Sequence, residues 1–392
     1  YRQSALDQLR ETGRAEGNGI SFGSGPAEGD LAFVFTGAAA AYSGMGTGLF
    51  SAFPELKSQV IERFPAAPDV AALFGSSLES AFDQLRATTL VSQAQSILLR
   101  EMLGISPTVA MGLSSGETNS LIAFGAWHDA DGLMETIGAC GMYDRDLGGR
   151  FETAQTYWQT DAPITFETWR LLYPEASVRA AVETEPRVSL TILYSSSDAV
   201  IAGPAKACKR VIDALGTGGN AIRVPHDLVV HTPVMTPYAV RWHRLHHRAT
   251  TPVEGIRFYA NATNASYTPD ADSVADMLTG QAVAEVNFPA TLRQARADGV
   301  STFIEIGPRD TLTRAIKDTL GADTPALPAD RFGQPEVQAI TDICALLFAR
   351  GFSVNVRWLK ARLQDLRATA RPLRTISPGD SRLPAHTEAP KM

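Results

Sequence analysis

Short apolar runs alternate with longer helical stretches along the middle of the chain. Leu31–Phe35 leads into a small-residue turn at Gly37, and Thr108–Met111 leads into a turn followed by the helical stretch Glu117–Trp127. Strands that alternate with helices favour an α/β architecture built on a mainly parallel sheet. Two further candidate strands follow nearer the C-terminus, at Phe258–Ala260 and Phe303–Ile306.

One internal stretch and both ends depart from this alternation. In Val188–Gly203 two β-rich runs flank a Ser/Asp turn, and a helix is expected over Ala205–Leu215, which is typical of a small α+β insert. Residues 11–30 are rich in glycine and polar residues, residues 371–392 are rich in proline and polar residues, and neither segment offers an apolar face. We therefore expect linkers at both ends of a module cut from a longer polypeptide.

Composition narrows the class of protein. The 392 residues are 44% hydrophobic and 20% charged, which is enough to bury a large core. The net charge is −7 without blocks of like charge, so we expect no nucleic-acid and no membrane partner. No apolar stretch is long enough to span a bilayer, and the N-terminus has no signal-peptide core. The three cysteines are far apart in sequence, as in a reducing compartment. We expect a cytoplasmic protein.

Two segments match the pattern G-x-S-x-G, namely residues 112–116 (GLSSG) and 19–23 (GISFG). A nucleophile elbow needs a strand before the serine and a helix after it, and its glycines let strand and helix approach closely. Ser114 meets this requirement, whereas Ser21 lies in the N-terminal linker. The backbone N–H of Ser115 would then lie at a helix N-terminus, where free N–H groups favour an oxyanion. A Gly-Ser turn without chemistry is the alternative for Ser114.

A serine nucleophile needs a general base, usually histidine. After residue 250 the chain has only His386, in the C-terminal linker, which argues against the chain order of an ordinary α/β-hydrolase. His231 follows the apolar run Leu228–Val230 and precedes Thr232-Pro233, so it ends an extended segment at a turn. A catalytic histidine and an ordinary loop histidine both fit that pattern.

Three further histidines, His243, His246 and His247, share one face of an expected helix. A metal site is conceivable at this spacing, but no carboxylate or cysteine pattern supports it. A solvated helix face is the favoured interpretation, and no metal is expected.

Several segments together resemble the malonyl-CoA:acyl-carrier-protein transacylase family, most closely acyltransferase domains of polyketide synthases. The likeness spans roughly residues 30–360, in order, which no single motif would supply. The segments are FVFTG (33–37), YSGMG (42–46), GLSSGE (112–117), VVHTP (229–233), FYAN (258–261) and FIEIGPRDTLT (303–313). The loop Ala38–Ala41 and the flanking linkers are most similar to iterative synthases of the enediyne type.

The resemblance implies an α/β-hydrolase-like large subdomain with an inserted ferredoxin-like small subdomain. Carried onto this chain, the large subdomain covers 31–132 and 206–360, and the small one covers 133–205. Linkers then cover 1–30 and 361–392.

The resemblance also implies a reaction. Ser114 attacks an acyl-CoA thioester, His231 moves the proton, and the backbone N–H groups of Ser115 and Ala38 hold the oxyanion. The acyl group passes to the phosphopantetheine thiol of an acyl carrier protein. A backbone carbonyl in the loop around Gly307–Asp310 is expected to orient His231. No bound cofactor is needed, and the partners are the carrier protein, a ketosynthase and other domains of the same synthase.

Substrate contacts are implied for residues within or near these segments: Gly37, Leu113, Val230, Asn261 and Arg145. The glutamine usual in the oxyanion loop is Ala38 here, and its backbone N–H survives that exchange. Malonyl-selective members place an arginine on the helix after the nucleophile, and a gap-free count puts Ala139 at that position.

Two explanations for Ala139 stay open. Neutral donors, water or another arginine, with Arg145 nearest in sequence, would hold a malonyl carboxylate, or the acyl group is an acetyl group or longer chain without a carboxylate. We expect malonyl. Two other functions are also open: a thioester hydrolase or editing domain with the same Ser–His pair, and a non-catalytic domain that docks a carrier protein.

Overall fold

The computed structural model describes residues 3, 7, 9–10, 15–17, 20–23, 25–65, 78–216 and 219–369. The described residues up to Asn355 form one compact unit, and those from Val356 to Thr369 belong to a second. In the second unit the structure describes one helix, α16 (Val356–Thr369). Residues 361–369 of the expected C-terminal linker are therefore helical, and 370–392 lie outside the described residues. Everything below concerns the first unit.

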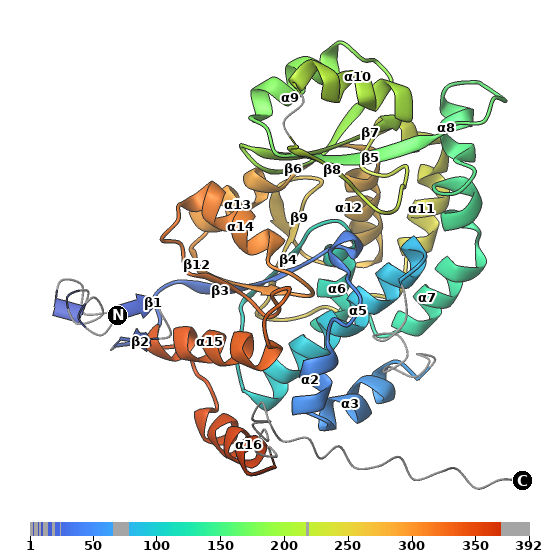
Figure 1. Cartoon of the computed structure of the whole chain (residues 1–392). Helices are drawn as coiled ribbons and strands as arrows, with labels where there is room; N and C mark the ends of the chain where they lie inside the picture. The colour runs from blue at the N-terminus through green and yellow to red at the C-terminus, as the bar shows by residue number, and fades with distance from the viewer. Residues whose placement is uncertain are drawn as a thin grey trace, which may run out of the picture. The chain divides into compact units, whose positions relative to one another are not determined.

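A six-stranded sheet forms the centre of this unit, in the order β10-β9-β4-β3-β12-β13 (Figure 1). Its neighbouring strands are parallel except that β10 runs antiparallel to β9. The α/β architecture with a mainly parallel sheet is confirmed. The strands are β3 (Asp30–Phe35), β4 (Val109–Gly112), β9 (Arg257–Ala260), β10 (Ala265–Tyr267), β12 (Val300–Ile306) and β13 (Ala326–Pro328).

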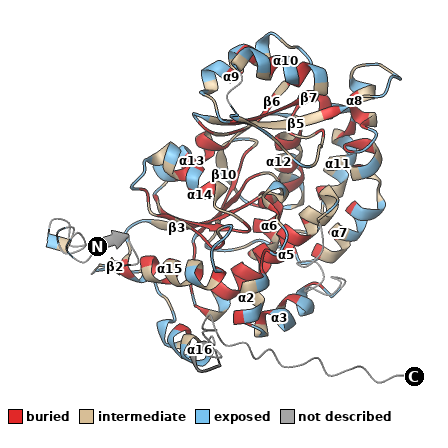
Figure 2. Cartoon of the chain, viewed as in Figure 1, coloured by how far each residue is buried: buried red, intermediate tan, exposed pale blue. Residues whose placement is uncertain are grey.

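Strand β3 shows why the sheet is covered on both faces. All its residues after Asp30 are buried (Figure 2), as expected for a parallel strand with helices on each side. Ala32 and Val34 pack in one cluster with residues of α13 (Phe288–Ala297) and α14 (Thr311–Leu320). The alternate residues, Phe33 and Phe35, place their rings edge-on against Phe124 at 6.3 Å each. The chain leaving β4 thus forms the opposite layer, with α6 (Ser115–Ala123) packed beside α5 (Ala81–Ile97).

The remaining helical segments connect and flank the sheets. They are η1 (Ala38–Ala40), α2 (Thr47–Ala52), α3 (Glu55–Arg63), η2 (Leu98–Met102), α7 (Ala130–Ala139), η3 (Met142–Asp146), α8 (Glu152–Tyr157), η4 (Pro233–Tyr238), α11 (Ala239–His246), α12 (Ala271–Val283) and α15 (Glu336–Ala349).

A second, five-stranded sheet has the order β11-β6-β7-β5-β8. From β5 to β8 its elements follow the order β-α-β-β-α-β of a ferredoxin-like motif, and all pairs among β5–β8 are antiparallel. They are β5 (Phe166–Leu171), α9 (Glu175–Glu183), β6 (Ser189–Ser195), β7 (Asp198–Pro204), α10 (Ala205–Leu215) and β8 (Ala221–Arg223). The fifth strand, β11 (Val286–Asn287), comes from later in the chain and runs parallel to β6.

The expected limits of the insert, 133–205, differ from this sheet at both ends. Residues 133–165 include the last part of α7, then η3 and α8, which hold no strand. At the other end α10 and β8 complete the motif, so the sheet continues to Arg223. The helix α10 begins and ends where the sequence predicted it.

The expected N-terminal linker, 1–30, also contains regular structure. β1 (Ala15–Gly17) and β2 (Ile20–Phe22) form an antiparallel hairpin. Ser21, the second serine in a G-x-S-x-G pattern, therefore lies in strand β2 and not at a strand-to-helix turn.

Within the described residues no helix is both long and apolar enough to cross a bilayer. In the same part of the chain no three His, Cys, Asp or Glu side chains are grouped so as to hold a metal ion.

Candidate active site

Ser114 sits at a strained turn between β4 and α6. Its backbone has φ 56° and ψ −125°, a conformation that costs energy for any residue other than glycine. The two flanking positions must be glycine, because a Cβ atom there would collide with nearby backbone. A Cβ on Gly116 would lie 2.1 Å from the carbonyl oxygen of Phe35, and one on Gly112 would lie 2.1 Å from the carbonyl carbon of Gly116. The segment thus has the geometry of a nucleophile elbow.

His231 lies against the hydroxyl of Ser114, with Nε2 2.7 Å from Oγ. Its other ring nitrogen, Nδ1, is 2.7 Å from the backbone carbonyl oxygen of Gln281 in α12. A carbonyl only accepts hydrogen bonds, so Nδ1 carries the proton and Nε2 is free to accept the proton of Ser114. The orienting carbonyl is therefore that of Gln281. The expectation that it comes from Gly307–Asp310 is wrong, and Asp310 instead forms an ion pair with Arg314.

The environment of His231 keeps the imidazole neutral. The residue is 5% exposed, and burial lowers its pKa to about 4, against a smaller opposing effect of the Gln281 carbonyl. Its backbone is in the left-handed region at φ 58°, and its N–H donates to the carbonyl of Ala282 at 2.7 Å. Two successive carbonyls of α12 thus hold the ring and the backbone of the same histidine.

Buried polar groups beneath the turn support the elbow. The Nδ2 of Asn261 donates to the Gly112 carbonyl at 2.7 Å and to Oε1 of Glu117 at 2.5 Å, and the Asn261 backbone N–H donates to the same Oε1. Burial raises the pKa of Glu117 to about 8 although these bonds oppose the shift. Asn261 therefore supports the turn from below and does not line the cavity above it.

The loop that would supply the second oxyanion donor is held from two sides. On one side the Ala38 N–H donates to Oγ of Ser115 at 3.0 Å. On the other, Nε of Arg309 donates to the Ala40 carbonyl at 2.9 Å, while the guanidinium lies 5.3 Å from each of the Tyr42 and Phe332 ring centres. The Ser115 hydroxyl thus engages the Ala38 N–H, and Arg309 fixes the same loop at Ala40.

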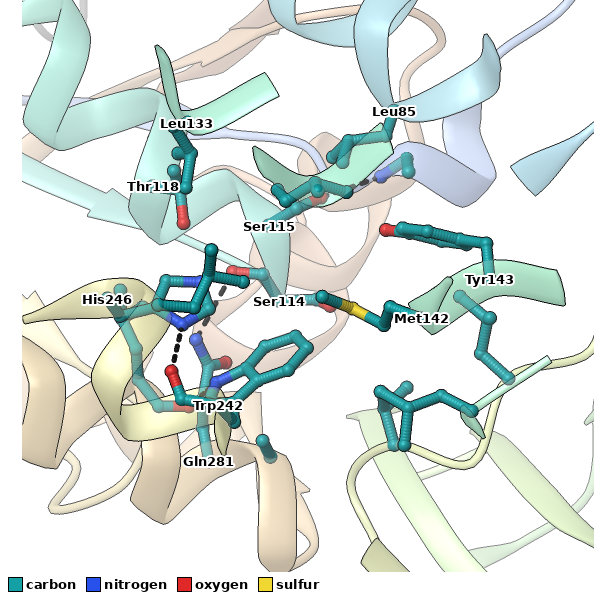
Figure 3. Close-up of a pocket in the computed structure, with 18 of the residues that line it drawn as sticks. Leu85, Ser114, Ser115, Thr118, Leu133, Met142, Tyr143, Trp242, His246 and Gln281 are labelled. Carbon is teal, nitrogen blue, oxygen red and sulfur yellow. Dashed lines mark hydrogen bonds between the residues drawn. The ribbon is translucent and has the colours of Figure 1, made fainter. Parts of the chain in front are cut away.

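A cavity of about 90 Å³ opens beside Ser114 and His231 (Figure 3). Met142 and Tyr143 face Ser114 from one side, and Trp242 and Gln281 lie on another. Most of the remaining wall is aliphatic. It comes from α5 (Leu85), α7 (Leu133, Met134, Ile137), the segments around η3 and His231 (Leu147, Leu228, Val230), α11 (Leu245) and α12 (Leu278, Ala282).

The structure brings some of the predicted site residues together and separates others. Ser114, Ser115, His231, Ala38 and Val230 all line the cavity. A Cβ on Gly37 would lie 3.0 Å from the carbonyl of Leu113, so the oxyanion loop is pressed against the elbow. The Leu113 side chain is buried in the core on the other side of the turn and does not reach the cavity.

Neither position considered for a substrate carboxylate reaches the cavity. The Arg145 guanidinium donates through Nε and Nη2 to Asp146 and through Nη2 to the Cys140 carbonyl. Ala139 is exposed at the end of α7. The proposal that Arg145 binds substrate is therefore not supported by its position.

The three clustered histidines do not form one solvated face. His243 is half-buried and pairs with Asp276, and His247 is exposed and pairs with Asp272. His246 is instead buried beside the cavity, stacked near Trp127 and Trp242, and burial lowers its pKa to about 4. Together with Gln281 and Trp242, it is a site residue that the sequence did not reveal.

Known proteins with similar sequences are large synthases. No protein-family model matches the chain. A subunit of the polyunsaturated fatty acid synthase of Thraustochytrium sp. is 25% identical over 256 residues, which is 61% of this chain and 12% of that protein. Polyketide synthase GfsA of Streptomyces halstedii is 26% identical over 372 residues, which is 90% of this chain and 5% of that protein. The chain thus spans only a small part of these relatives.

Solved structures show the fold. The acyltransferase domain from the second module of the salinomycin polyketide synthase matches with a TM-score of 0.69 at 22% identity, over 94% of this chain and 85% of that one. A malonyl-transacylase solved in complex with a type II polyketide synthase acyl carrier protein matches with a TM-score of 0.64 at 21% identity, over 81% and 99%. The chain has the fold of this class of acyltransferases, and its sequence relatives are polyketide and fatty acid synthases.

Proposed function

We propose that this chain is an acyltransferase that moves an acyl unit from coenzyme A to an acyl carrier protein through an ester on Ser114. The observation that carries the proposal is the aligned set Ser114 Oγ, His231 Nε2 and the Gln281 carbonyl, with both hydrogen bonds at 2.7 Å, at the edge of an apolar cavity. Such a set activates a serine, and the cavity gives the acyl group a place to lie.

The geometry supports a two-stage transfer. In the first stage Nε2 of His231 takes the Ser114 proton while Oγ attacks the thioester carbon, and the Ser115 and Ala38 N–H groups receive the oxyanion. The C–S bond then breaks, and the coenzyme A thiolate takes the proton from His231. In the second stage a phosphopantetheine thiol gives its proton to His231 as its sulfur attacks the ester carbon. The bond from that carbon to Ser114 Oγ then breaks, His231 returns the proton to Oγ, and the acyl group leaves on the thiol. Burial lowers the pKa of His231, so the imidazole is neutral at the start of each stage and Nε2 is free to accept each proton.

The partner and the setting belong to the same proposal. An acyl carrier protein is the acceptor we propose, supported by the fold shared with a transacylase solved in complex with one. We also propose a place in the cytoplasm beside the ketosynthase and other domains of a synthase, and the small share of each synthase relative that the chain covers supports a multidomain setting. An iterative synthase of the enediyne type stays the proposed host on the sequence of the loop Ala38–Ala41. Malonyl, as expected from the resemblance, is one candidate acyl unit, and an uncharged group is the other.

Intact-protein mass spectrometry tests the function. The chain is incubated with a panel of acyl-CoAs, and Ser114→Ala is run beside it. We expect an acyl adduct on the unchanged chain only, which disappears when a carrier protein bearing phosphopantetheine is added and reappears on that protein. An adduct on Ser114→Ala would refute the assignment of the nucleophile. Thioester consumption without transfer would indicate a hydrolase, and neither adduct nor consumption with any acyl-CoA would indicate a docking domain.

A further inference from the structure

We infer that the acyl group carried by Ser114 is an uncharged aliphatic chain longer than acetyl, and that malonyl is a poor substrate. The inference rests on the acyl transfer proposed above. The side chains that form the cavity wall carry the inference about the acyl chain. These side chains are independent of the alignment of Ser114 and His231.

Most of the cavity wall around the position of an acyl chain is apolar. Aliphatic or thioether side chains reach it from α5, α7, the segment around η3, α11 and α12. On α7 the wall residues are Leu133, Met134 and Ile137, spaced as one face of a helix. Because the wall extends over five segments of the chain, it provides contact for several methylene groups and not only for a methyl group.

The polar groups in the wall are neutral. Among the described residues that line the cavity there is no Lys, Arg, Asp or Glu. The Thr89 hydroxyl is used internally, since it donates to Oδ1 of Asn119 at 2.9 Å. His246 donates from Nδ1 to the Trp242 carbonyl, and burial favours its neutral form. Figure 3 shows the Tyr143 hydroxyl turned toward the cavity, where it offers one neutral donor.

The arginine considered as a partner for a malonyl carboxylate lies outside the cavity wall. Arg145 is bound to the buried Asp146, to which Arg241 also pairs at 3.8 Å. Ala139 does not line the cavity. The internal segment 66–77, which the structure does not describe, contains no lysine, arginine or histidine.

The cavity therefore disfavours a malonyl group and favours an aliphatic acyl chain. A malonyl carboxylate would lose its hydration in the cavity without a cationic partner, which is strongly unfavourable. Each buried methylene of an aliphatic chain would instead favour acylation by about fourfold while the cavity accommodates it. The kcat/KM for acylation should thus rise with the length of the acyl chain until the chain fills the cavity.

The test measures kcat/KM for acylation of Ser114 in the 392-residue chain by intact mass. Malonyl-, acetyl-, butyryl-, hexanoyl- and octanoyl-CoA are compared separately, and the later hydrolysis of each adduct is followed. We expect the best aliphatic substrate to exceed malonyl by about 100-fold, as an unpaired buried carboxylate implies.

A variant pair tests the reason for the preference. Met134→Arg places a cation in the α7 wall at a half-buried position, and Met134→Leu is the control of similar volume. We expect Met134→Arg to raise the malonyl-to-hexanoyl ratio by about tenfold or more and Met134→Leu to leave it within about twofold. If Met134→Arg does not fold, the acyl-CoA series on the unchanged chain still decides the question.

The outcomes separate this inference from the function. Malonyl equal to or faster than every aliphatic substrate would overturn the inference while leaving the acyltransferase intact. Acetyl faster than all longer chains would overturn the expected length. No adduct with any substrate would overturn the function itself.

Discussion

Acylation of Ser114 should survive acidification that would stop an ordinary histidine base. Burial lowers the pKa of His231 from its ordinary value of 6.5 to about 4. At pH 5 a base with a pKa of about 4 is about 90% neutral, whereas one with a pKa of 6.5 is only about 3% neutral. The expected difference in rate at pH 5 is therefore about 30-fold.

The assay is single-turnover acylation at low acyl-CoA concentration between pH 4 and pH 8, since this regime reports the free enzyme. We expect a constant rate from pH 8 to pH 5 and a fall to half near pH 4. His243→Gln, which replaces a half-buried histidine that pairs with Asp276 and does not line the cavity, is the control and should leave the profile unchanged. A half-maximal rate between pH 6 and pH 7 would refute the reasoning.

Unfolding must be measured over the same range. The folded-state pKa values of His231 and His246 lie below the unfolded value, so the unfolded chain binds more protons and stability is lost as pH falls from 6.5 toward 4. Burial raises the pKa values of Glu117 and Glu305 to about 8, so their contribution has the opposite sign and stability is gained as pH falls from 8 toward 4.5. Each of these four groups changes the free energy of unfolding by about 2 kcal/mol between pH 7 and pH 5. The losses from the two histidines and the gains from the two glutamates offset, so the fold should persist at pH 5.

Substitutions at three positions test other parts of the site. Gly116→Ala should lower the free energy of unfolding by about 3 kcal/mol or more, because its Cβ meets the Phe35 carbonyl at 2.1 Å, and an unchanged urea midpoint would contradict this. Asn261→Leu should cost about 2–3 kcal/mol of stability and slow acylation, because the Gly112 carbonyl and Glu117 lose the side-chain amide donor; unchanged acylation would show that the elbow does not need it. Arg309→Gln should slow acylation about tenfold with little loss of stability, as a positioning residue for the loop at Ala40. Arg309→Lys should not restore the rate, since an ammonium lacks the planar group that lies over the Tyr42 and Phe332 rings, and full rescue by lysine would exclude this role.

The sequence revealed the parts of the site that depend on local structure. The elbow at Ser114 is a strand, a tight turn and a helix in succession, so the G-x-S-x-G pattern together with its flanking strand and helix is enough to locate it. His231 stood out because an apolar run ends there before a proline. These positions can be read without knowing which distant segments pack around them.

Other features depend on contacts that carry no local signal. The carbonyl that orients His231 belongs to Gln281, and any residue type could supply it at that position. Counting along α7 placed Ala139 at the substrate, but the helix face that meets the cavity is formed by Leu133, Met134 and Ile137. The small sheet was predicted to end too early because its last strand, Ala221–Arg223, is only three residues long.

The short strand β11 limits which segments can be exchanged between related proteins in a chimera. Three residues separate the His231-binding carbonyl of Ala282 from Val286, which pairs with Ile192 of the small sheet. A second tie is the 2.7 Å hydrogen bond between the hydroxyls of Ser189 and Thr232. If residues 166–223 alone were replaced by those of a relative, the edge strand β11 would still come from the original chain. His231 would then be connected through β11 to a sheet from another protein. A chimera that keeps its activity should take residues 281–288 from the same parent as the small sheet.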